Sequence, residues 1–163
     1  MGGLSPLGVI HTAVSLVALI CGFAVLARDR EISPKNRLGQ TYLVATLLTA
    51  ATALGIFRHG GFGPPHVLAL LTLAALAVGA SASYSGIFGG ASRYVQAACY
   101  SATFLFHLIP GFTETLTRLP AGAPIAASAE APLLKAIDAA LLLLFLLGLV
   151  AQILWLRASQ RAR

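Results

Sequence analysis

The chain has 163 residues, of which 58% are hydrophobic and only 10% are charged. Soluble domains carry about 25% charged residues, so this composition excludes an ordinary water-soluble domain and predicts an all-α integral membrane protein. The formal charge of +6 does not indicate nucleic-acid binding, because the basic residues flank apolar segments and form no basic face.

Five apolar segments are candidates to cross the hydrocarbon, which takes roughly 20 residues per helix. They are residues 6–27, 41–57, 66–86, 94–113 and 136–156, and the second is short and rich in threonine. We expect a single transmembrane domain covering residues 1–163. No Lys or Arg stands among the first six residues, so we expect a retained first helix and not a cleaved signal peptide.

The basic residues predict the orientation, because cytoplasmic loops of membrane proteins are enriched in Lys and Arg. Placing the N-terminus outside leaves only Arg58, Arg118 and Lys135 on the outer side. The other eight are then on the inner side: Arg28, Arg30, Lys35, Arg37, Arg93, Arg157, Arg161 and Arg163. We therefore expect the N-terminus outside and the C-terminus in the cytoplasm.

Small and weakly polar residues recur at helical spacing in the first four segments, and such residues mark packing faces in membranes. In the first three segments they are His11, Ser15, Ala18 and Gly22, then Tyr42, Thr46, Thr49 and Ala53, then Thr72, Gly79, Ser83 and Gly86. The fifth segment, with the run 139–147 (AALLLLFLL), has almost no such stripe. This pattern predicts a four-helix transmembrane bundle with a fifth, peripheral helix.

All four histidines, His11, His59, His66 and His107, fall toward the outer side in this topology. Ionisable residues inside a span are costly and usually face the bundle interior or a water-filled cavity. On the fourth segment, Tyr100, His107, Glu114 and Arg118 share one helical face. We therefore expect an outer-leaflet site with His11, His66 and His107 as cofactor or metal ligands, closed by Tyr100, Glu114 and Arg118.

Imidazoles on different helices could ligate haem b or a transition metal, or they could donate to a quinone or relay protons. The opposing interpretation is structural, with each imidazole hydrogen-bonded to a neighbour.

The spacing places Glu114 and Arg118 as an i,i+4 pair, and Lys135 and Asp138 as a second, interfacial pair. No nucleophile–base–acid set or phosphate loop is evident, which favours a non-enzymatic protein.

Three functions follow as hypotheses. The first is a site for haem, metal or quinone in electron transfer. The second is a non-catalytic accessory or oligomer-forming subunit of a larger membrane complex. The third is a small proton-coupled transporter, which is weakened because the chain lacks inverted halves with paired broken helices. In each case membrane lipid is a partner, and nucleic acid is not.

Three stretches carry a family resemblance: the run from His11 to Gly22, residues 35–42 (KNRLGQTY), and Pro65-His66 before a Leu/Ala/Thr-rich helix. Over about residues 8–110 the chain resembles a family of bacterial membrane proteins, the domain of unknown function number 2306. The resemblance implies a helical bundle in the bacterial inner membrane and no particular activity. Where that family has His before Arg, this chain has Asn36.

Overall fold

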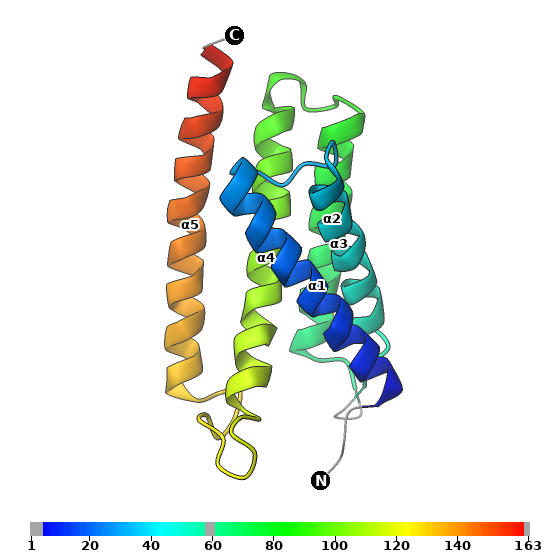
Figure 1. The fold of residues 1–163 in the computed structure, drawn as a ribbon, viewed down its shortest axis with the longest axis vertical. Coiled ribbons are helices and arrows are strands. Elements are labelled where there is room, and N and C mark those ends of the chain that lie inside the picture. Colours follow the sequence, from blue (N-terminus) through cyan, green and yellow to red (C-terminus); the bar gives the residue numbers. More distant parts are fainter. Residues whose placement is uncertain (1–4, 58–60, 162–163) are drawn as a thin grey trace. The chain divides into compact units, whose positions relative to one another are not determined.

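The computed structural model describes residues 5–57 and 61–161, and over these residues the chain is helical with no strand (Figure 1). The helices are α1 (Pro6–Asp29), α2 (Arg37–Ala53), α3 (Pro64–Tyr84), α4 (Ser92–Leu116) and α5 (Pro132–Arg161), and a 3-10 turn (Gly89–Ala91) precedes α4. The predicted all-α class is confirmed. The predictions for residues 1–4, Arg58, His59 and Arg163 lie outside the described residues.

The helix boundaries follow from capping residues. Ser5 accepts a hydrogen bond from the Gly8 N–H at 3.1 Å, with Pro6 at the first helical position of α1. Helix α1 ends at Asp29, and the C-cap residue Arg30 has a left-handed φ of 61°. Helix α2 both begins and ends earlier than the predicted 41–57, because Asn36 caps its start and the chain turns after Ala53.

The cap at Asn36 joins two structural elements. Its Oδ1 accepts from the Gly39 N–H at 2.8 Å, and its Nδ2 donates to the Asp29 carboxylate at 3.2 Å. We expect Asn36→Ala to destabilise the protein by about 1 kcal/mol, since an unfilled N-cap leaves an orphan donor. Unfolding by denaturing detergent measures this loss. Asn36→Ser retains a capping oxygen and should recover most of it, so equal losses in the two variants would contradict the capping role.

The chain divides into two compact units, Met1–Phe104 and Leu105–Arg163. In the first unit, α1, α2, α3 and the first half of α4 pack together around a core. The core of this unit includes Ala18, Val25, Ile32, Tyr42 and Tyr100. The second unit contains the rest of α4 and α5.

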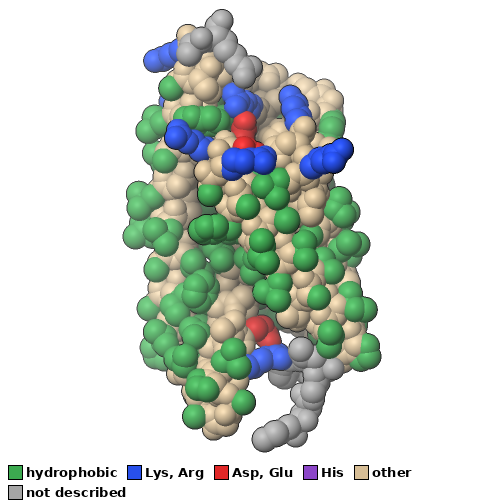
Figure 2. All heavy atoms as spheres, in the orientation of Figure 1, with side chains coloured by type: hydrophobic (Ala, Val, Ile, Leu, Met, Phe, Trp, Pro, Cys, Tyr) green, Lys and Arg blue, Asp and Glu red, His purple; other side chains and the backbone are tan. Residues whose placement is uncertain are grey.

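Burial on α1 is the reverse of that in a soluble protein. Its buried residues are mostly small, with Gly8, Ala18 and Gly22 among them. Its large apolar side chains are outside: Ile20 is 69% exposed and Phe23 is 70% exposed. In Figure 2, hydrophobic side chains cover the middle of the helices, and Lys and Arg gather toward helix ends. Small residues inside and large apolar residues outside are typical of helices that pack in lipid.

Three helices of the described part are long and apolar enough to cross a membrane, namely α1, α3 and α5. Helix α2 has 17 residues, fewer than the roughly 20 that a span takes. Helix α4 is long enough but carries polar side chains along its 25 residues. The count of five spans and the orientation of the termini therefore stay predictions.

Candidate functional site

His11 is held by the neighbouring helix. Its Nδ1 lies 3.1 Å from the Thr49 carbonyl oxygen and 3.0 Å from the Thr52 hydroxyl. The Thr49 carbonyl can only accept, so an Nδ1–H donates to it and joins α1 to α2. Ser15, one turn along, lies 3.4 Å from the Thr49 hydroxyl. Through its Nδ1 atom, His11 therefore helps to hold α1 against α2. Its predicted role as a ligand stays a prediction.

His66 stands at the start of α3 and is only 4% exposed. Its Nδ1 accepts a hydrogen bond from the Gly63 N–H at 3.2 Å, which caps the helix. The rings of Phe57 and Phe62 flank the imidazole, with centroids at 4.7 Å and 5.1 Å. Its Nε2 is buried and has no hydrogen-bond partner in the described part of the chain. Such an orphaned buried polar atom calls for a partner.

Tyr100 lies in the first unit and belongs to a different cluster from His66. Its ring fills a notch over Gly79 of α3, and its hydroxyl lies 3.3 Å from the Ser83 hydroxyl. One turn along α4, Thr103 bonds the Tyr42 hydroxyl at 2.7 Å and donates to the Tyr100 carbonyl at 2.7 Å. Both tyrosines are fully or almost fully buried. Tyr100 thus acts in helix packing.

The other three predicted site residues, His107, Glu114 and Arg118, lie in the second unit. His107 is buried on α4, and the exposed Glu114 and Arg118 form the predicted i,i+4 ion pair. The predicted pair of Lys135 with Asp138 is wrong. Lys135 pairs with Glu130 at 3.1 Å, because the turn before α5 brings that carboxylate close. One Asp138 carboxylate oxygen is buried with no hydrogen-bond partner among the described residues.

No group of three or more His, Cys, Asp or Glu side chains in residues 5–57 and 61–161 is arranged to hold a metal ion. The predicted metal ligands are divided between the two units, with His11 and His66 in one and His107 in the other. A joint site of the three imidazoles stays a prediction.

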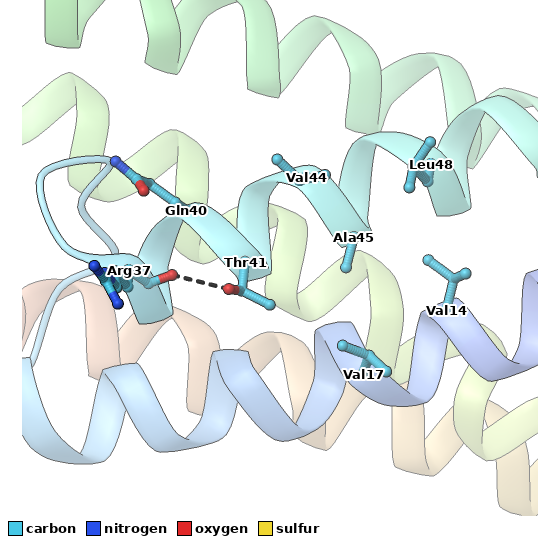
Figure 3. A pocket seen from close by; sticks show the side chains of 8 residues that line it. All are labelled: Val14, Val17, Arg37, Gln40, Thr41, Val44, Ala45 and Leu48. Atoms are coloured by element: carbon cyan, nitrogen blue, oxygen red, sulfur yellow. Dashed lines mark hydrogen bonds between the residues drawn. The ribbon is translucent and has the colours of Figure 1, made fainter.

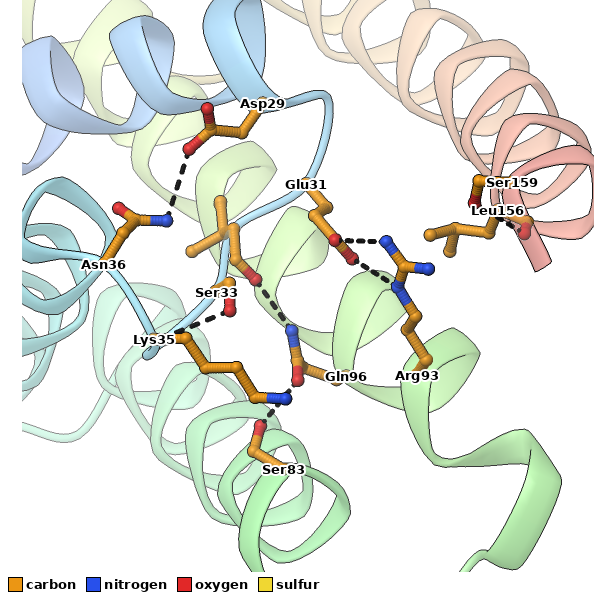
Figure 4. A network of polar contacts seen from close by, with 11 residues as sticks. Asp29, Glu31, Ser33, Lys35, Asn36, Ser83, Arg93, Gln96, Leu156 and Ser159 are labelled. Atoms are coloured by element: carbon orange, nitrogen blue, oxygen red, sulfur yellow. Dashed lines mark hydrogen bonds and ion pairs between the residues drawn. The ribbon is translucent and has the colours of Figure 1, made fainter. Parts of the chain in front are cut away.

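A polar network at the opposite end of the first unit was not predicted from the sequence (Figure 4). The Arg93 guanidinium donates to both Glu31 carboxylate oxygens, at 2.7 Å and 3.3 Å. Gln96 donates to the Ile32 carbonyl at 3.1 Å and accepts from the Ser83 hydroxyl at 3.0 Å. The network therefore joins the α1–α2 connection to α3 and α4.

This network also shows in which direction the helices of the first unit run. It places the α1–α2 connection, the end of α3 and the start of α4 at one end of the unit. His66 stands at the start of α3, and therefore at the other end of that helix. Helices α1, α2, α3 and α4 therefore alternate in direction. The sequence signal that could have revealed the network is a set of polar residues at helix ends, which the apolar pattern of the helices does not account for. They are Glu31, Ser83, Arg93 and Gln96.

No family model, no curated protein and no solved structure matches this chain. The resemblance to the bacterial membrane-protein family therefore rests on the three motifs quoted above, and no relative supplies a function.

Proposed function

We propose that the chain is a multi-pass protein of the bacterial inner membrane, with its N-terminus outside. Three helices of sufficient length and apolarity support this proposal, as does the exposure of large apolar side chains on them. The alternating course of α1 to α4 supports it too, because it puts Arg28, Arg37 and Arg93 at one end of the first unit. Basic residues gathered on one side are typical of the cytoplasmic side.

We further propose that the protein binds a ligand with a carbonyl oxygen, of the quinone class, at His66. The observation that carries this proposal is the buried Nε2 atom of His66, which has no hydrogen-bond partner among residues 5–57 and 61–161. Because Nδ1 accepts the Gly63 N–H, the neutral imidazole carries its proton on Nε2. A donor in contact with two phenylalanine rings suits the oxygen and the flat ring of a quinone.

The same hydrogen bond favours quinone over haem or a metal at this residue. A metal would need the lone pair of Nε2, which requires the proton to be on Nδ1. That proton would face the Gly63 N–H and remove the cap of α3. Phe57 and Phe62 are 59% and 63% exposed, so either ring has space to turn aside and admit a ligand.

The test is the quinone content of the protein purified in mild detergent, measured by solvent extraction and chromatography. We expect His66→Phe to lose the bound quinone, because phenylalanine keeps the aromatic stack but has no donor. His11→Gln is the matched control, since that side chain is bonded within the α1–α2 pair. Equal quinone content in the wild type and His66→Phe would exclude the site. A Soret band in the absorption spectrum, or a metal in stoichiometric amount, would show that the ligand is haem or a metal and not a quinone.

A further inference from the structure

A groove of about 610 Å³ runs along the paired helices α1 and α2 of the first unit (Figure 3). Its two ends differ in chemistry. One end is polar, with Arg37, Gln40 and Thr41 from the first turns of α2. The rest is apolar, and its lining is Val14, Val17, Val44, Ala45 and Leu48. An occupant of this groove must therefore be amphipathic, with a polar head and an apolar tail.

The length of the groove matches one leaflet of a bilayer. From Arg37 to Leu48 the helix rises about 16 Å at 1.5 Å per residue. Half of the hydrocarbon core is about 15 Å. The polar end of the groove meets residues 28–37, the segment that faces the cytoplasm in the proposed topology. An acyl chain that starts at Arg37 would thus reach about the bilayer midplane.

At the polar end, Arg37 carries a positive charge that no carboxylate of the described residues neutralises. Residues 28–37 contain four basic and two acidic side chains. Both carboxylates are already paired, Asp29 with Arg28 at 2.7 Å and Glu31 with Arg93 at 2.7 Å. No carboxylate of the described residues forms an ion pair with Arg37, whose side chain is exposed. The head of the occupant is therefore expected to be anionic.

We propose that this groove binds one anionic phospholipid of the cytoplasmic leaflet. Its phosphate pairs with Arg37, and one acyl chain lies along Val14, Val17 and Val44. This inference rests on the proposed membrane topology and is independent of the ligand proposed for His66. A zwitterionic lipid would weaken the pairing by bringing its own cation to Arg37. A helix of a second copy of the chain would leave the guanidinium without a counterion unless a carboxylate faced it.

The test uses the full-length protein in nanodiscs of equimolar phosphatidylglycerol and phosphatidylcholine, with retained lipids counted by native mass spectrometry. We expect Arg37→Gln to lower the preference for phosphatidylglycerol about fivefold, the effect of one basic side chain at an anionic membrane surface. Val44→Trp should remove the lipid by filling the groove. The controls are Arg161→Gln, on α5, and Leu47→Trp, an exposed position of α2 outside the groove lining.

Three results would overturn the proposal. The first is a preference for phosphatidylglycerol that is the same in the wild type, Arg37→Gln and Val44→Trp. The second is competition by soluble glycerol phosphate, which would show an anion site without a lipid. The third is loss of a dimer in Val44→Trp with an unchanged lipid count, which would make a second copy the occupant. Extraction of the protein by alkaline carbonate would instead refute the membrane topology, and His66→Phe leaves lipid binding unchanged.

Discussion

Replacing Gly79 by leucine is expected to destabilise the protein by about 3 kcal/mol, at the upper end of the range for overpacked cores. Even a Cβ atom at this position would collide with the Tyr100 ring. The ring would have to leave the notch, and the Tyr100 hydroxyl would then lose Ser83. Because the contact joins α3 to α4, we expect the two helices to separate locally. Unfolding by denaturing detergent, followed by circular dichroism, measures the loss.

Gly148 is the matched control, because a Cβ there meets nothing within 4 Å and the residue is exposed on α5. Gly148→Leu should leave stability unchanged or raise it slightly, since leucine is a better helix former than glycine. A similar loss in both variants would mean that added bulk, and not the notch, disturbs the protein. Gly79→Ala should show a smaller loss than Gly79→Leu, because less of the ring has to move.

Glu31→Gln is expected to cost about 2 kcal/mol, which is in the range for hydrogen bonds to charged groups. The change leaves the Arg93 guanidinium without the carboxylate that it contacts at 2.7 Å. The pair is shielded, since the Glu31 and Arg93 side chains are only 14% and 30% exposed. Salt should therefore weaken it little. The measurement is the detergent unfolding midpoint at low and high salt.

Glu130→Gln provides the comparison, because Glu130 pairs with Lys135 while both side chains are largely exposed. We expect no measurable change there, as for most surface ion pairs. A double-mutant cycle of Glu31→Gln with Arg93→Gln isolates the pairwise contribution. A coupling energy near zero would show that the two residues stabilise the protein separately.

The helix positions were predictable because apolar runs, prolines and caps are local signals. Helix α3 begins at Pro64, two residues before the predicted segment 66–86, and the stripe of Tyr42, Thr46 and Thr49 is buried as predicted. The predicted ends of α2, residues 41 and 57, were each about one turn later in the chain than the observed ends, Arg37 and Ala53. The apolar pattern continues past Ala53, and it does not show that the Asn36 cap starts the helix one turn earlier.

Contacts between distant residues were not predictable in the same way. Glu31 and Arg93 are 62 residues apart, and the residues around each of them do not indicate that the two side chains form an ion pair. His66 was predicted as a ligand on its depth alone, whereas the cap through Gly63 and the flanking phenylalanines depend on the turn before α3. His11 was predicted on the same ground, and nothing in its local pattern indicated its hydrogen bonds to Thr49 and Thr52 of α2.

The reversed burial on α1 also bears on the thermodynamics of unfolding. The heat-capacity change of unfolding grows with the apolar area that becomes newly hydrated, by about 0.45 cal/K/mol/Å². In this helix Gly8, Ala18 and Gly22 have little such area to release, and Ile20 and Phe23 are already outside. In a micelle or bilayer those large side chains stay among hydrocarbon chains in both states. The free energy of unfolding should therefore fall almost in a straight line with temperature, without the dome that water-soluble domains show.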